Sequence, residues 1–203
     1  MRKLLLLITF ISTLFSFGQN KKEYIVDENF KSISDETFKN KLKEVDNHKM
    51  KYYYKFYEND TAKIGQVLLF RTKGVVSLDK RKSITDYIYK ITGRKITPNQ
   101  NIVISYYNSE KRKGDCMNFQ LKDKELRKYF KNNTQSFQIA FARKENMRNI
   151  KNLYIDAENI IRDNLFSEFW GCGNYIIIRP DGRYLKELGE HHPHDIIKDI
   201  KSF

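Results

Sequence analysis

The segment NYIIIRPDGRYLKELG, residues 174–189, constrains the fold more than any other part of the sequence. An apolar run, a Pro-Asp-Gly turn at 180–182 and a second, mixed run predict an antiparallel β-hairpin. Proline presets the backbone angle φ for such a turn, and glycine accepts a positive φ. We therefore expect a sheet that contains at least one antiparallel pair of strands.

Strand-like and helix-like segments alternate around this hairpin from residue 101 onward. The runs NIVISYY (101–107) and SFQIAFA (136–142) are almost continuously apolar, which is typical of strands covered on both faces. Helices are expected in KELRKYFKN, capped by Asp123, in AENIIRDNLF and in HDIIKDIKSF, with a short extended piece at NLYID. Strands separated by helices favour a parallel pair, so we predict an α/β fold with a mixed central sheet and helices on both faces.

The part of the chain before residue 101 is less regular. Ser34 caps a predicted helix with Phe38, Leu42 and Val45 on one face, and KYYYKFYEN (51–59) alternates as a half-buried strand does. A further strand is expected in IGQVLLFRTKG, ended by Gly74, and a helix over 83–93 is expected to stop at Gly93. We divide the chain into an N-terminal α+β extension at 19–63 and a main domain at 64–203.

The order of elements in the second half resembles the thioredoxin-like fold, in particular the exported branch related to cytochrome-maturation thioredoxins and peroxiredoxins. The segment LYIDAENIIRDNLFSEFWGCGNYIIIRPDGRYLKELG carries the resemblance, with the Pro-Asp-Gly turn at 180–182 and a closing glycine at Gly189. The resemblance covers about half the chain. It implies a thioredoxin-like central sheet in the domain at 64–203.

The sequence departs from that family at the active site. The loop after residue 107 holds a single cysteine, Cys116, so the C-x-x-C motif is absent. The family's cis-proline position falls on Gly173, and Cys172 stands immediately before it. The resemblance implies that Cys116 and Cys172 face each other at one end of the sheet. The candidate catalytic pair is therefore Cys116 and Cys172, and the residues expected to flank this site are Trp170, Gly171, Gly173, Lys113 and Asp115.

Three interpretations of the two cysteines stay open. They form a structural disulfide, which would restrict the unfolded chain by roughly 4 kcal/mol on the loop-entropy model. Alternatively, they form a working redox pair with Cys116 as the attacking thiolate and Cys172 as the resolving thiol. Lys111, Arg112 and Lys113 would favour that thiolate, and Asp115 opposes them. In the third interpretation both are unpaired thiols without a role.

The first residues have the layout of a secretory signal peptide. Arg2 and Lys3 precede an apolar region from Leu4 to Phe15, and the small residues Ser16 and Gly18 precede a cut before Gln19. Residues 1–18 are therefore the expected signal peptide, and the mature protein is expected to be soluble and periplasmic or secreted. No other stretch is apolar enough to cross a bilayer, and an exported chain can keep a disulfide.

Composition favours no nucleic-acid partner and no cofactor. The formal net charge is +13, but lysines are scattered among acidic residues, which is typical of a solvated surface. Three histidines, His191, His192 and His194, could in principle bind a metal, yet adjacent imidazoles diverge. Helix capping and solvent exposure is the favoured interpretation, so no metal site is expected.

The sequence thus predicts a divergent, exported thioredoxin-like protein of the bacterial cell envelope. In one hypothesis it is a thiol-disulfide oxidoreductase acting through Cys116 and Cys172. In the alternative it is a non-catalytic binding or structural module of the envelope, stabilised by a Cys116–Cys172 disulfide, with another envelope protein as the partner to consider.

Overall fold

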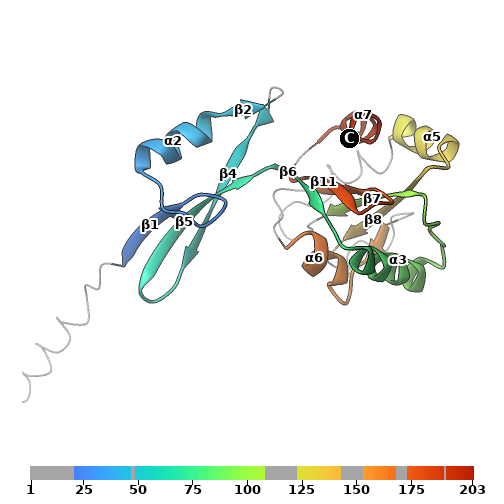
Figure 1. The fold of residues 1–203 in the computed structure, drawn as a ribbon, viewed down its shortest axis with the longest axis horizontal. Helices are drawn as coiled ribbons and strands as arrows, with labels where there is room; N and C mark the ends of the chain where they lie inside the picture. The colour runs from blue at the N-terminus through green and yellow to red at the C-terminus, as the bar shows by residue number, and fades with distance from the viewer. Residues whose placement is uncertain (1–20, 47–48, 108–122, 143–152, 168–172, 190) are drawn as a thin grey trace, which may run out of the picture. The chain divides into compact units, whose positions relative to one another are not determined.

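The computed structural model describes residues 21–46, 49–107, 123–142, 153–167, 173–189 and 191–203 (Figure 1). The chain divides into two compact units, Met1–Phe70 and Arg71–Phe203. The expected boundary between residues 63 and 64 falls inside strand β5 (Ala62–Leu69), which belongs to the first unit. None of the helices in the described ranges is long and apolar enough to span a membrane.

The first unit is a small α+β unit, with one helix among its described residues. Its three-stranded sheet has the order β1-β5-β4, in which β1 (Lys22–Val26) runs parallel to β5 and β4 (Tyr52–Glu58) runs antiparallel to it. Strands β2 (Val45–Asp46) and β3 (Lys49–Met50) form a short antiparallel pair.

Helix α2 (Asp35–Lys43) begins at the expected cap, because the Ser34 side chain accepts a hydrogen bond from the backbone N–H of Thr37 at 3.2 Å. It packs on the sheet through Phe38, whose ring centroid lies 5.9 Å from that of Tyr54. The expected place of Val45 on the helix is wrong. Glu44 adopts an extended backbone and ends the helix, so Val45 lies in β2 and is 62% exposed.

The second unit is built on a six-stranded mixed sheet. In sheet order its strands are β6 (Arg71–Val75), β11 (Arg183–Glu187), β10 (Gly173–Ile178), β7 (Asn101–Tyr107), β8 (Ser136–Ala142) and β9 (Leu153–Ile155). Strands β7, β8 and β9 are parallel, whereas β10, β11 and β6 join by antiparallel pairs. The predicted parallel pair and the hairpin are both confirmed.

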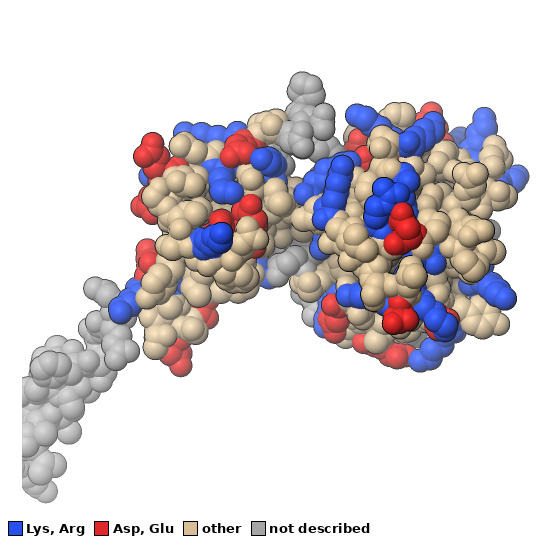
Figure 2. All heavy atoms as spheres, viewed as in Figure 1, with Lys and Arg blue, Asp and Glu red and all other residues tan. Residues whose placement is uncertain are grey.

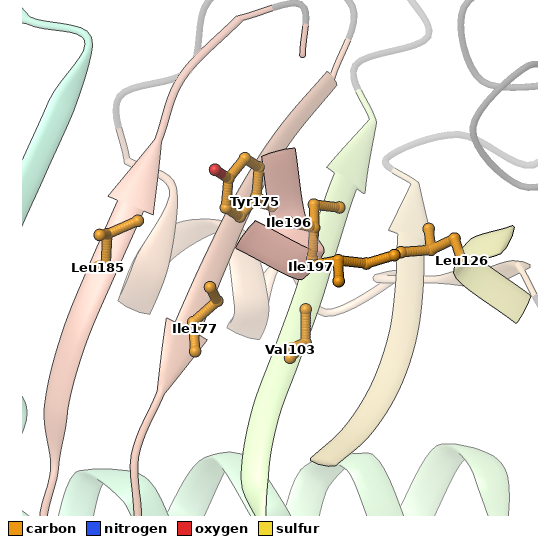
Figure 3. Close-up of a cluster of buried hydrophobic side chains, with 7 residues drawn as sticks. All are labelled: Val103, Leu126, Tyr175, Ile177, Leu185, Ile196 and Ile197. Carbon is orange, nitrogen blue, oxygen red and sulfur yellow. The ribbon is translucent and has the colours of Figure 1, made fainter. Parts of the chain in front are cut away.

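Helices cover both faces of this sheet, as Figure 1 shows. The helices are α3 (Leu78–Thr92), α5 (Lys124–Asn132), α6 (Ile160–Leu165) and α7 (Pro193–Ser202). On one face, residues of α5 and α7 pack against the strands in a buried cluster (Figure 3) composed of Val103, Leu126, Tyr175, Ile177, Leu185, Ile196 and Ile197. On the other face the ring of Tyr87, from α3, stacks on Phe141 of β8, and Tyr106 stacks on Phe166 after α6.

Local sequence signals explain the helix ends. The Asp123 carboxylate accepts a hydrogen bond from the Leu126 backbone at 2.6 Å and so begins α5 where the sequence predicts. Gly93 has φ +68° and ends α3 as a left-handed cap. In the hairpin turn, Gly182 has φ +87°, and a Cβ at this position would lie 2.3 Å from the carbonyl oxygen of Val76, so no other residue fits without strain.

One element was predicted wrongly and two differ in length. The stretch IGQVLLFRTKG was predicted as one strand, but it contributes to β5 and β6, which pair in different sheets. A continuous apolar run, VLLF (67–70), reaches Phe70 and gives no sign that the pairing partner changes there. Helix α3 begins five residues earlier than expected, capped by Ser77, and α6 is shorter than the predicted AENIIRDNLF. The fold class itself, a mixed central sheet with helices on both faces and an N-terminal α+β part, is confirmed.

Candidate functional site at the carboxyl edge of the central sheet

Among the seven residues that the sequence places at the site, only Gly173 lies within the described ranges. It is buried and is the first residue of β10. The remaining six lie outside the described residues: Lys113, Asp115, Cys116, Trp170, Gly171 and Cys172.

The sheet register nevertheless places the two strand residues that border the cysteine-bearing segments. Tyr107, the last residue of β7, pairs with Gly173, the first residue of β10. Tyr107 also pairs with Ala142, the last residue of β8. These three buried residues form one row across the carboxyl edge of the parallel strands. Residues 107 and 173, which border the two cysteine-bearing segments, are therefore direct neighbours.

The row is well buried from solvent. Tyr107 is 2% exposed, and burial raises the pKa of its hydroxyl even though a hydrogen bond with Ser105 acts in the opposite direction. A protonated, buried phenol at this place contributes packing and no charge.

Asn174 ties the next loop to this edge. Its side-chain oxygen accepts a hydrogen bond from the backbone N–H of Gly189 at 3.0 Å, and its Nδ2 lies 3.4 Å from the carbonyl oxygen of Tyr106. Asn174 is fully buried, and Gly189 has φ +89°, which favours glycine. The match of Gly189 to the closing glycine of the resembled motif therefore has a structural reason.

A charged network lies two residues inside the edge, on the face covered by α5 and α7. Arg71 at the start of β6 contacts Asp199 of α7, with 2.7 Å between Nη2 and Oδ1, and Glu187 of β11, with 3.3 Å between Nη1 and Oε2. The hydroxyl of Tyr175 donates a short hydrogen bond to the second oxygen of Asp199. Figure 3 shows Tyr175 nearer than Ile177 to the end toward which β7 points.

Electrostatics keep Tyr175 protonated and Arg71 charged. Burial raises the pKa of the Tyr175 hydroxyl, and its hydrogen bond to Asp199 raises it further. Burial acts to lower the pKa of Arg71, but the hydrogen bond and the negative charge of Asp199 outweigh it and the pKa is raised. Both Asp199 oxygens are engaged, so this carboxylate positions β6, β10 and α7 relative to one another instead of serving as a base.

The opposite face of the sheet buries a second aspartate, Asp156, directly after β9. Its carboxylate accepts hydrogen bonds from the Tyr87 hydroxyl at 2.9 Å and from the backbone N–H groups of Ile161 at 3.2 Å and Arg162 at 2.8 Å. Burial raises the pKa of Tyr87, and Asp156 adds to the effect. Asp156 therefore caps the first turn of α6, where Asn159 makes no side-chain cap bond.

One of the three histidines, His191, is placed differently from what was expected. His191 is 7% exposed, its ring centroid lies 4.5 Å from that of Tyr175, and its Nδ1 lies 3.1 Å from the carbonyl oxygen of Gly189. The expectation that it faces solvent is therefore wrong, since the loop after β11 turns it onto the Tyr175 ring. His192 is the residue before α7, and its backbone N–H donates to Asp195 at 3.0 Å, while His194 is exposed.

Sequence reasoning missed both buried aspartates. Asp199 stands between Ile196 and Ile200 on the inward face of a predicted helix, where a carboxylate needs a partner, and this position was an available signal. The residues within the described ranges contain no group of three or more His, Cys, Asp or Glu side chains that could hold a metal ion.

Comparisons with known proteins give fold-level likeness only. No protein-family model matches the sequence, and no curated protein matches it. The exposed lipoprotein thioredoxin Etrx1 of Streptococcus pneumoniae is 10% identical, with a TM-score of 0.40 over 52% of this chain and 87% of that one. A DsbF homologue of Corynebacterium diphtheriae is 14% identical, with a TM-score of 0.39 over 52% of this chain and 73% of that one.

Proposed function

We propose that this is an exported thioredoxin-like protein of the cell envelope in which Cys116 and Cys172 exchange thiols and disulfides. The main support is the pairing of Tyr107 with Gly173. Cys172 immediately precedes Gly173 in the chain, and Cys116 lies nine positions after Tyr107. An extended chain covers about 3.3 Å per residue, so nine residues are long enough for Cys116 to fold back to the sheet edge beside which Cys172 stands in the sequence.

The proposed exchange has two balanced steps. The Cys116 thiolate attacks one sulfur of a substrate disulfide, forms a mixed disulfide and releases the other substrate sulfur as a thiolate. The Cys172 thiolate then attacks the Cys116 sulfur, which releases the second substrate thiolate and closes the Cys116–Cys172 disulfide. Two electrons pass from the cysteine pair to the substrate, and the reverse sequence oxidises a substrate dithiol.

Export is part of this proposal. Residues 1–18 have the charged start, apolar middle and small-residue end of a signal peptide. Delivery outside the cytoplasm would place the two cysteines in an oxidising compartment, where a disulfide persists. Residues 113 and 115 would then tune the Cys116 thiolate by opposite charges.

Reduction of insulin by dithiothreitol tests the activity. The protein is expected to accelerate insulin precipitation, and Cys116→Ser and Cys172→Ser are each expected to abolish that acceleration, since both thiols are needed for turnover. A parent protein that gives no rate above dithiothreitol alone would remove the enzyme from consideration.

A second function is favoured by one feature of the sequence, the single cysteine in the loop after residue 107. Without a C-x-x-C pair, a Cys116–Cys172 disulfide would only stabilise the fold of a non-catalytic envelope module. In that case reduction is expected to lower the free energy of unfolding by about 4 kcal/mol, and insulin reduction stays at the background rate.

A further inference from the structure

A groove between α5 and α7 lies on the outer side of the helix layer that covers the sheet. Its volume is about 490 Å³, and all its lining residues come from the two helices and the α5 cap: Glu125, Lys128, Tyr129, Asn132, Asn133, His194, Ile197 and Lys201. Basic side chains gather over α5 and α7 in Figure 2, which has the same view as Figure 1.

The charged side chains of the lining are two lysines, Lys128 and Lys201, and one carboxylate, Glu125. Across the described part of the chain, no carboxylate lies within 4.0 Å of the Lys128 or Lys201 ammonium, although other lysines of this unit, such as Lys82 and Lys90, have such a partner. These two ammonium groups are therefore available to a ligand.

The rest of the lining is suited to a peptide. Ile197 is 8% exposed and belongs to the core cluster, and Tyr129 packs partly against that cluster, so the floor is apolar. The Lys201 ammonium lies 5.9 Å from the centroid of the Tyr129 ring, which holds the positive charge beside the floor. The Asn132 side chain adds an amide that can pair with a peptide backbone.

Size and charge distribution favour a short peptide over a nucleic acid. A duplex contacts a continuous basic stripe, and single strands stack their bases on exposed rings. Here two lysines border a small concave site, and the Tyr129 ring is half-buried against the core. Carboxylate side chains could reach both lysines while a backbone crosses the floor.

We propose that the groove between α5 and α7 binds an acidic segment of a partner protein. Its carboxylates pair with Lys128 and Lys201, and its backbone lies over Tyr129 and Ile197. Because both cations are at the surface, the interaction is expected to be fast, modest in affinity and sensitive to salt. This interaction does not depend on thiol–disulfide exchange, so insulin reduction neither supports nor contradicts it.

Fluorescence anisotropy with the full-length protein tests the proposal. The probe is a fluorescein-labelled peptide of alternating glutamate and alanine, and a lysine–alanine peptide of the same length is the control. Lys128→Glu and Lys201→Glu are each expected to weaken binding about tenfold, because each reverses a contacting charge. Lys124→Glu and Lys198→Glu make the same charge change on the same helices outside the groove, and are expected to weaken binding less than about twofold.

Three results would overturn the proposal. Equal weakening by all four substitutions would indicate a general attraction to the basic protein. Absence of binding up to about 1 mM peptide would remove the site. Tighter, groove-dependent binding of a single-stranded oligonucleotide or of phosphatidylglycerol vesicles would assign the groove to another kind of partner. Amide chemical shifts of the unmodified protein provide a readout that needs no variant: changes must centre on Lys128, Tyr129, Asn132 and Lys201.

Discussion

The two faces of the six-stranded sheet each bury an aspartate that accepts a hydrogen bond from a tyrosine. The two aspartates differ in how far along the chain their other partners lie. Asp156 binds Tyr87 and two backbone N–H groups only five and six residues further along the chain. Asp199 binds Tyr175 and Arg71, which is 128 residues away. One carboxylate organises a local turn, and the other joins distant parts of the unit.

This difference separates local from global stability. Loss of Asp156 frees mainly the first turn of α6, whereas loss of Asp199 disconnects β6, β10 and α7 at once. A buried carboxylate held by backbone N–H groups needs no counter-ion, whereas removal of Asp199 takes one of two carboxylates from the Arg71 guanidinium, which keeps only the longer contact with Glu187. Substitutions of the two aspartates should therefore differ in how much stability they remove and in how much of the unit they affect.

Asp199→Ala is expected to have the larger effect, about 3 kcal/mol lost from the free energy of unfolding. Breaking a buried ion pair typically costs about 3–5 kcal/mol, and the lower end applies because the Arg71 side chain is 36% exposed. Urea unfolding followed by circular dichroism measures this loss. The double variant Arg71→Met with Asp199→Leu should be less destabilised than Asp199→Ala, and a single-variant loss below about 1 kcal/mol would contradict the role of the network.

Asp156→Ala is expected to cost about 2 kcal/mol, the sum of a lost helix cap and a buried hydroxyl without its acceptor. Hydrogen exchange should show faster exchange of the Ile161 and Arg162 amides, with little change in β10. Glu158→Ala, which removes an exposed ion pair with Lys90, is the matched control and should cost less than about 0.5 kcal/mol. Uniformly faster exchange through the whole sheet would contradict the claim that Asp156 stabilises only the first turn of α6.

Tyr175→Phe is expected to have the smallest effect near neutral pH, about 1 kcal/mol, together with a change in the alkaline pH dependence. The folded pKa of Tyr175 is raised above its unfolded value, so its stabilising contribution is complete below about pH 10 and is lost as the pH rises further. The parent protein should therefore lose about 1 kcal/mol more stability than the variant between about pH 10 and pH 11, because the unfolded tyrosine is half ionised at the lower of these values. Unfolding midpoints in urea at the two pH values measure the slopes, and equal slopes would mean that Tyr175 ionises normally in the folded protein.

Local patterns predicted much of the second unit. The continuous apolar runs, the Asp123 cap, the Gly93 stop and the Pro-Asp-Gly turn all depend on neighbours within a few residues, and the structure confirms each of them. The same reasoning failed where the pairing partner of a strand changes without a change in the apolar sequence pattern, as between β5 and β6 on either side of Phe70.

The charged network shows why the site could be predicted only in part. Nothing near Arg71 in the sequence indicates that its carboxylates stand at 187 and 199, because their proximity depends on the complete sheet order. The burial of His191 likewise depends on Tyr175, which lies on another strand. The pairing of Tyr107 with Gly173 is also long-range, but the resemblance to the thioredoxin-like fold implied that the two ends meet.

The most direct test of the proposed cysteine pair is non-reducing peptide mapping by mass spectrometry of the protein isolated from the cell envelope. The proposal predicts one peptide pair joined through Cys116 and Cys172, which separates into two thiol-bearing peptides on reduction. Two free thiols under oxidising conditions, or a cysteine linked only to another molecule, would contradict the central claim that the ends of β7 and β10 bring these residues together.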